Sequence, residues 1–153
     1  YYPDNSVQHA GAVLGVGGVA GHAQKYYRRD ADGYDYRLKL VQNYSAVTAA
    51  CLLVRREVFE EVGGLNEENL PVAFNDVDFC LRVRAAGYRN LWTPYAELYH
   101  HESVSRGADN NRKKRARALA EANYMRERWG EELFNDPAYN PQLTLAYEDF
   151  SLK

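Results

Sequence analysis

The chain has 153 residues, of which 46% are hydrophobic and 26% charged, a composition typical of a folded globular domain rather than a disordered segment. Its formal net charge of -2 provides no overall field that would attract nucleic acid, so we expect no nucleic-acid partner. The apolar runs are short and interrupted, so we also expect no transmembrane helix. The chain begins Tyr-Tyr-Pro without an initiator methionine, and we expect it to be a portion of a longer protein.

The first predicted element is a strand over residues 7–15, which leads into a glycine-rich loop over residues 15–22. Such a loop can cradle phosphate. Neither a Lys-Ser/Thr pair nor a clear helix follows it here, which favours a flexible or substrate-lining loop. Asp30 and Asp32 form an Asp-x-Asp-Gly sequence that could bind a metal or make a turn. No hydrophobic strand precedes it, which favours the turn.

The apolar run over residues 46–54 predicts a buried strand. Residues 55–62 predict a short helix that ends at Gly63 and Gly64. A second helix is expected over residues 76–86, with an apolar stripe at helical spacing. This order of elements begins an alternation of strands and helices.

Two carboxylates lie at the start of the second helix. Asn75 suits the N-cap position, and Asp78 would complete a capping box. Asp76 and Asp78 are two residues apart, so their side chains point in different directions around the helix. One of them can face a cleft and act as a general base, or both can serve only the helix terminus.

Residues 88–93 and 96–101 predict two further strands, and the resulting order of elements indicates an α/β layered domain. His100 and His101 are adjacent on the last strand, so we expect only one of them to line the site of the carboxylate. One histidine and one aspartate are too few ligands for a self-contained zinc site. The alternatives are a metal shared with a substrate diphosphate, or a polar histidine at a strand end.

Residues 109–129 predict a helix with a basic start, followed by an extended arm after Asp136. Acidic residues follow the basic cluster, so we interpret it as a solvated helix face rather than a nucleic-acid site. The expected buried stripe of this helix comprises Ala116, Leu119, Ala120, Asn123 and Tyr124.

Cys51 and Cys80 are the only cysteines, and both lie in apolar segments without a CxxC or Cys/His zinc pattern. We therefore expect two buried free thiols in a reducing cytoplasm. The expected location is cytoplasmic, with the inner face of the membrane as the alternative.

Together these motifs resemble the acceptor-side half of a family 2 glycosyltransferase with the GT-A fold, of the bacterial surface-polysaccharide kind. Residues 47–67 resemble the strand, helix and GGFDE turn of that family. Residues 74–82, FNDVDFCLR, resemble its EDxDLxxR segment. Gly87-Tyr88 and residues 94–100, PYAELYH, match the GY…PxAxxxH continuation. The resemblance covers residues 7–107.

The resemblance implies a partial GT-A-like, Rossmann-like layered α/β domain over residues 1–107. A C-terminal helix and extended arm would occupy residues 108–153. The first half of the family's domain, with its nucleotide-binding strands and metal-binding Asp-x-Asp, has no counterpart here. We therefore expect the chain to be inactive alone, and to self-associate through its exposed sheet edge.

The implied activity is the inverting transfer of a sugar from a nucleotide-sugar donor to a hydroxyl of a saccharide or lipid-linked saccharide, in O-antigen-like polysaccharide synthesis. Asp76 takes the position of the family's catalytic base, and His100 that of a histidine near the metal, Mn²⁺ or Mg²⁺, and the diphosphate. Asn75 replaces the usual Glu of the motif. The substrate-binding residues implied by the resemblance are Gly63, Gly64, Asn75, Trp92, Ser105 and Arg106.

Two other functions remain open at this point. A non-catalytic carbohydrate- or partner-binding module would use the tyrosines and Trp92 as stacking faces. A metal-dependent hydrolase would use Asp76, Asp78 and His100 together.

Overall fold

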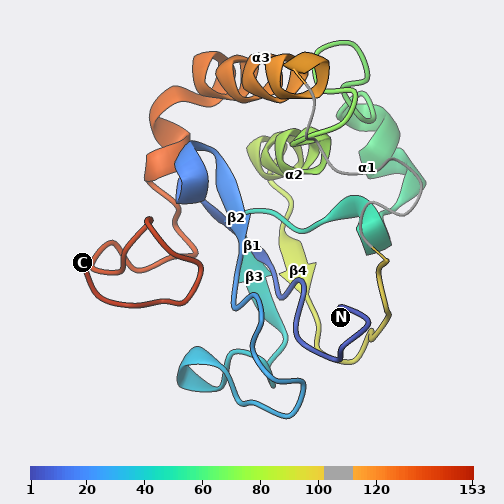
Figure 1. The fold of residues 1–153 in the computed structure, drawn as a ribbon. Coiled ribbons are helices and arrows are strands. Elements are labelled where there is room, and N and C mark those ends of the chain that lie inside the picture. The colour runs from blue at the N-terminus through green and yellow to red at the C-terminus, as the bar shows by residue number, and fades with distance from the viewer. Residues whose placement is uncertain (102–111) are drawn as a thin grey trace.

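The computed structural model describes residues 1–101 and 112–153, which form a mixed α/β fold with small sheets and a long C-terminal helix (Figure 1). The described strands are β1 (Ala12–Leu14), β2 (Ala20–His22), β3 (Gln42–Tyr44) and β4 (Asn90–Trp92). The described α-helices are α1 (Arg56–Glu61), α2 (Asn75–Ala85) and α3 (Arg112–Trp129). Short 3-10 turns cover Val16–Gly18, Tyr34–Tyr36, Ala49–Cys51 and Gly130–Phe134.

The strands make two antiparallel pairs. β1 pairs with β2, so that Ala12 lies opposite His22, and β3 pairs with β4, so that Gln42 lies opposite Trp92. An isolated bridge between Ala12 and Ala46 joins the two pairs. α3 crosses over α2 on one side of these strands, and α1 lies beside α2 (Figure 1).

Two of the predicted strands are confirmed in shortened form. The predictions over residues 7–15 and 88–93 correspond to β1 and β4. The predicted strand over residues 46–54 is wrong, because its first backbone N–H groups bind side chains and Leu53 is 99% exposed. The predicted strand over residues 96–101 is also wrong. That segment binds the N-terminal residue instead of a neighbouring strand. A GT-A-like layering remains a prediction.

The three predicted helices are confirmed to within a few residues as α1, α2 and α3. The predicted capping box is wrong. Phe74, in the left-handed conformation with φ of 61°, precedes α2 as its N-cap residue and makes no side-chain capping bond. Asn75 is the first helical residue rather than the cap.

Asp78 is fully buried between α2 and α3. Its Oδ2 accepts a hydrogen bond from Arg82 Nε at 2.8 Å, and its Oδ1 accepts one from Trp129 Nε1 at 3.0 Å. Arg128 Nε lies 3.1 Å from the same Oδ1. The carboxylate therefore joins the two helices instead of capping one of them.

Arg82 extends this connection to the end of α1, where it donates to the carbonyl oxygens of Val62 and, at 2.7 Å, Gly64. Gly63 and Gly64 have φ values of 80° and 67°, which glycine adopts readily, and they end the helix as the sequence predicts.

The expected buried stripe of α3 is wrong. The buried residues of α3 are Glu121 and Met125, whereas Leu119 is 60% exposed. Glu121 Oε1 accepts the backbone N–H of Val72 at 2.9 Å, so this helix turns a carboxylate toward the loop before α2. Apolar periodicity gives no sign of such a polar contact.

The C-terminal segment is fastened to β1 and to the residue that follows β3. Asp136 Oδ2 accepts the N–H of Leu14 at 2.9 Å, and its Oδ1 accepts the hydroxyl of Ser45 at 2.5 Å. Leu133, Tyr139, Leu143 and Phe150 add to the main core around β1, α2 and Met125. No helix among residues 1–101 and 112–153 combines the length and the apolar content that a membrane crossing requires.

The prediction of two buried thiols is wrong for Cys51, which is exposed because residues 49–51 form a surface turn. Cys80 is buried, and this burial raises the pKa of its thiol to about 12. The two cysteines therefore differ in reactivity, since the thiolate is the reactive form.

Replacing Asp78 by Ala leaves Arg82 and Arg128 without their carboxylate, and we expect it to lower the free energy of unfolding by about 3 kcal/mol or more. Urea denaturation measures this change. Asp30→Ala is the matched control, because it breaks an exposed pair with Arg28 and should change stability little. Equal effects of the two substitutions would contradict the role given to Asp78.

We expect the native chain to release one equivalent of thiolate product with Ellman's reagent, and two in denaturant. The native signal should disappear in Cys51→Ser and persist in Cys80→Ser. Rapid modification of both thiols in the native chain would show that Cys80 is not shielded.

Candidate functional site

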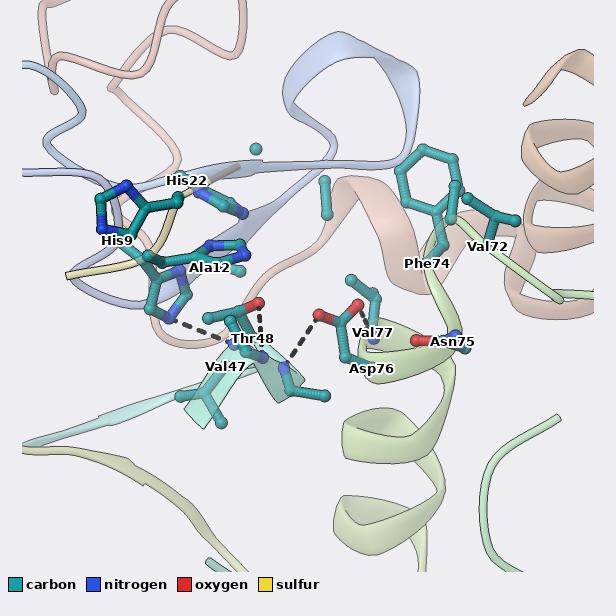
Figure 2. Close-up of a pocket in the computed structure, with 17 residues that line it drawn as sticks. His9, Ala12, His22, Val47, Thr48, Val72, Phe74, Asn75, Asp76 and Val77 are labelled. Carbon is teal, nitrogen blue, oxygen red and sulfur yellow. Dashed lines mark hydrogen bonds between the residues drawn. The ribbon is translucent and has the colours of Figure 1, made fainter. Parts of the chain in front are cut away.

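A cavity of about 550 Å³ lies between the β1–β2 pair and the start of α2 (Figure 2). His9 and His22 lie on one side of it, and Asn75 and Asp76 lie on the other, with Thr48 between them (Figure 2). Its polar lining residues are His9, His22, Thr48, Asn75, Asp76, His100 and His101. Among the described residues, the lining contains neither lysine nor arginine.

Asp76 is half-buried in the first turn of α2. Its Oδ1 accepts the N–H of Val77 at 2.9 Å, and its Oδ2 accepts the N–H of Ala49 at 3.1 Å. A negative charge interacts favourably with the helix dipole at this end of a helix. These bonds fix the group at the cavity wall and leave further lone pairs for a donor such as a sugar hydroxyl.

Residues 47–50 form the segment between the two walls. Each of their four backbone N–H groups donates to a side chain. The N–H of Thr48 binds His9 Nε2 at 3.2 Å, and the next N–H, from Ala49, binds Asp76. One short segment therefore sets the positions of an imidazole and of the carboxylate.

His9 is held as a neutral ring. Its Nε2 accepts the Thr48 N–H, and its Nδ1 is shielded from solvent without a hydrogen-bond partner. Burial lowers the pKa of His9 well below its usual value of 6.5, and the nearby His22 and the N-terminal amine lower it further. The rings of His9 and His22 meet edge to face, with centroids 4.8 Å apart.

His22 and His100 both bind the buried residue Gln8. His22 Nδ1 lies 3.0 Å from the Gln8 backbone oxygen, and His100 Nδ1 lies 2.7 Å from the Gln8 Oε1. The Gln8 amide also donates to the backbone oxygen of His100 at 3.2 Å. The loop before β1, the end of β2 and the segment around residue 100 therefore meet at this residue.

The structure brings together three of the predicted site residues, Asp76, Asn75 and His100. It also places His101 in the same lining, contrary to the expectation that only one of the two histidines could face the site. That expectation required a strand, and residues 96–101 do not form one.

The remaining predicted site residues lie elsewhere. Gly63 and Gly64 lie at the end of α1, outside the lining of this cavity. Trp92 lines a second cavity of about 580 Å³. Ser105 and Arg106, and the predicted domain boundary between residues 107 and 108, lie outside the described residues.

The second cavity adjoins the first. His9, Val47, Thr48, Ala50 and His100 line both of them. Exposed apolar side chains surround the second cavity, including Leu53, Leu91 and Tyr95. Its wall is therefore more apolar than that of the cavity around Asp76.

Sequence reasoning missed His9, His22 and Gln8 as members of the site. The chain contains four histidines, and all four line this one cavity. Their small number was the available signal that His9 and His22 could belong to the site. Within residues 1–101 and 112–153, no three or more His, Cys, Asp or Glu side chains are grouped so that they could hold a metal ion. A metal in this cavity would need ligands from outside this part of the chain.

The chain is similar to several known bacterial proteins. It is 61% identical over 152 residues to an uncharacterized protein of Sinorhizobium fredii, across 99% of this chain and 17% of that protein. It is 38% identical over 161 residues to the O-antigen biosynthesis protein RfbC of Myxococcus xanthus, across 99% of this chain and 12% of that protein. It is 40% identical over 63 residues to an N-acetylglucosaminyl-diphospho-decaprenol L-rhamnosyltransferase of Mycobacterium tuberculosis, across 41% of this chain and 20% of that protein.

The chain thus spans less than a fifth of the two relatives that it matches along almost its whole length. No family model matches the chain, and no solved structure matches it significantly. The names of two relatives refer to O-antigen synthesis and to rhamnosyl transfer.

The lowered pKa of His9 predicts a pH-dependent stability. Below pH 6.5 the unfolded chain binds a proton at this position that the folded chain excludes. The contribution of His9 is therefore complete above pH 6.5 and is lost as the pH falls, with a slope of up to about 1.4 kcal/mol per pH unit. Urea denaturation from pH 7.5 to 5.0 should show this slope. His9→Gln should reduce the slope by up to the contribution of one proton, about 1.4 kcal/mol per pH unit. An unchanged slope would contradict a neutral, buried His9.

Proposed function

We propose that this chain is part of an inverting family 2 glycosyltransferase with a GT-A fold, which transfers a sugar from a nucleotide-sugar to a saccharide or lipid-linked saccharide during surface-polysaccharide synthesis. The observation that carries the proposal is the geometry of Asp76. Two backbone N–H groups hold its carboxylate at a helix start, on the wall of a cavity that is large enough for a monosaccharide. The names of the relatives support the same class of chemistry.

In this proposal, Asp76 is the general base. Its carboxylate accepts the proton of the acceptor hydroxyl while the hydroxyl oxygen attacks the anomeric carbon, and the nucleoside diphosphate leaves. Asn75 precedes it in the same lining and is placed to bind a substrate hydroxyl or phosphate. Because the carboxylate is already fixed, it needs no reorientation during the transfer, and this lowers the activation free energy of the reaction.

The proposal includes Mn²⁺ or Mg²⁺, to which the residues of the cavity fit in part. His100 donates from Nδ1 to Gln8, so its Nε2 is available as a ligand. The described residues lack a cluster of three ligands, so the other ligands would come from the substrate phosphates and from groups elsewhere. When bound, such a cation would neutralise the charge of the departing diphosphate.

The donor site would lie largely outside this chain, which spans less than a fifth of its two long relatives. We therefore propose that the isolated chain is inactive and that activity belongs to the longer protein, on the cytoplasmic side or at the inner face of the membrane. Leu53, Leu91 and Tyr95 are exposed in this chain, and the remainder of a larger protein could cover them. In the isolated chain this uncovered apolar surface supports the predicted self-association. Direct substrate contacts by Gly63, Gly64, Ser105 and Arg106 remain predictions.

A second candidate function rests on the cavity beside Trp92. Aromatic faces there, with Tyr95 and Tyr99 in the same lining, suit stacking against sugar rings, as in a non-catalytic carbohydrate-binding module. Titration of the full-length protein with nucleotide-sugars plus Mn²⁺, and then with oligosaccharides, separates the two functions. Binding of oligosaccharides alone would favour the module.

Replacing Asp76 by Asn in the full-length protein removes the proton acceptor and keeps the size of the side chain. We expect the rate of sugar transfer to fall by about 10²-fold or more. Asp30→Asn, in an exposed turn, is the control and should keep the rate of the parent protein. If Asp76→Asn folds normally and transfers sugar at nearly the parental rate, Asp76 is not the base.

A further inference from the structure

Residues 71–74 lead into α2 and form part of the cavity wall beside Asp76. The lining residues of this segment are Val72, Ala73 and Phe74 (Figure 2). The structure describes all four residues of the segment as bends, with neither helix nor strand among them. The position of the candidate base therefore depends on how an irregular segment is held.

Phe74 has a strained backbone at the junction with α2. Its φ of 61° lies in the left-handed region, which is uncommon for a residue with a bulky side chain. Such a conformation is costly and persists only where the surrounding contacts hold it. The Phe74 carbonyl oxygen accepts the N–H of Asp78 at 2.9 Å, which ties the strained residue to the first turn of α2. The side of the segment that precedes Phe74 needs a contact of its own.

Glu121 of α3 provides a contact on that side. Its Oε1 accepts the backbone N–H of Val72 at 2.9 Å, two residues before the strained position. No other N–H group of residues 72–74 binds a partner within residues 1–101 and 112–153. In this part of the chain, the carboxylate of a distant helix is therefore what holds the backbone of the lining segment from outside.

The burial of Glu121 fits this role. The residue is 1% exposed, although a carboxylate without partners is costly to bury. Its second oxygen, Oε2, lies 3.6 Å from Nε of Arg117, one turn earlier on α3. An apolar residue, which helical periodicity favours at a buried position, would leave the Val72 N–H without this acceptor.

We propose that Glu121 is a positioning residue of the site: it holds the segment before α2 through the Val72 N–H, and thereby keeps the Asp76 carboxylate on the Ala49 N–H. The inference rests on the proposed function for the role of Asp76 as the base. It brings into the site the helix α3, none of whose described residues lines the cavity.

Tyr124 provides a comparison within the same helix. Its hydroxyl accepts a hydrogen bond from Asn66 Nδ2 at 2.9 Å, so α3 contacts the chain before α2 at a second point. Asn66 lies outside the lining of the cavity. Loss of this second bond should therefore lower the stability of the chain without changing the wall beside Asp76.

The test follows the backbone amide signals of Ala49 and Val77 in ¹H–¹⁵N NMR spectra of the 153-residue chain, because both N–H groups bind the Asp76 carboxylate. Glu121→Leu removes the acceptor of the Val72 N–H. We expect the Ala49 amide proton to shift upfield in this variant, because it loses its bond to the carboxylate. The Val77 amide, which binds Asp76 within the same helix, should move less.

Two matched variants serve as controls. Glu121→Gln keeps an acceptor oxygen for the Val72 N–H and removes the charge, so the Ala49 signal should stay at its parental position. Tyr124→Phe removes the bond to Asn66 and should also leave the Ala49 signal in place. If Glu121→Leu does not fold, Glu121→Ala removes the same acceptor without added bulk and is compared in the same way.

Three results would overturn the proposal. An unchanged Ala49 signal in the folded Glu121→Leu chain would show that the Val72 contact does not hold the wall. Equal shifts in Glu121→Leu and Glu121→Gln would show that the charge, and hence the pair with Arg117, is what matters. An equal shift in Tyr124→Phe would show that any loosening of α3 has the same effect.

The same variants in the full-length protein test the consequence for catalysis, with the donor and acceptor used for Asp76→Asn. Glu121→Leu should lower kcat by about 10²-fold, since a small misplacement of a reacting group can cost a factor of this order. Glu121→Gln should restore most of the parental kcat, and Tyr124→Phe should leave it unchanged. A parental kcat in Glu121→Leu, where Asp76→Asn abolishes transfer, would overturn the proposal. If Asp76→Asn remains active while the Ala49 signal shifts as expected, the base assignment fails and the positioning of Asp76 by Glu121 stands.

Discussion

Asp78 accepts hydrogen bonds with both carboxylate oxygens from groups on α2 and α3, and its partner Arg82 reaches the end of α1. The relative placement of the three helices depends on this buried charge. α2 also carries Asp76 on its first turn, so the direction in which the candidate base points follows from the same contact. Removing one member of such a buried pair leaves an uncompensated charge, so the arrangement tolerates little change.

The cavity itself depends on hydrogen bonds made by side chains to the backbone. Residues 47–50 lie between the imidazoles and the carboxylate, and all four of their N–H groups are bound by side chains. Asp76 and His9 bind successive N–H groups, so neither can move without breaking a contact of this segment. Gln8 fixes the opposite wall in a similar manner through His22 and His100. The site is therefore held by polar contacts between segments that are far apart in the sequence.

α1 and α2 could be predicted from the sequence because their apolar spacing and glycine stops are local. The sequence wrongly predicted a strand over residues 46–54. The side chains that bind its backbone N–H groups in place of a neighbouring strand, such as those of His9 and Asp76, are remote in the sequence. The family resemblance pointed to Asp76 and His100, which lie in the lining of one cavity. It gave no sign of His22, which joins that lining from β2 and contacts Gln8, as His100 does. The sequence assigned Asp78 to a helix cap, which is wrong. An aspartate at this position of a helix can make either a local cap or an ion pair with remote residues, and the sequence alone does not distinguish the two.

The two adjoining cavities share a wall that includes His9, Thr48 and His100. A molecule that enters one of them and displaces this wall changes the free energy of binding in the other. Such linkage is reciprocal, so each occupant alters the affinity for its neighbour by the same factor. One ligand beside Trp92 and another beside Asp76 would then bind as a coupled pair, and the order in which they arrive would not change the strength of that coupling.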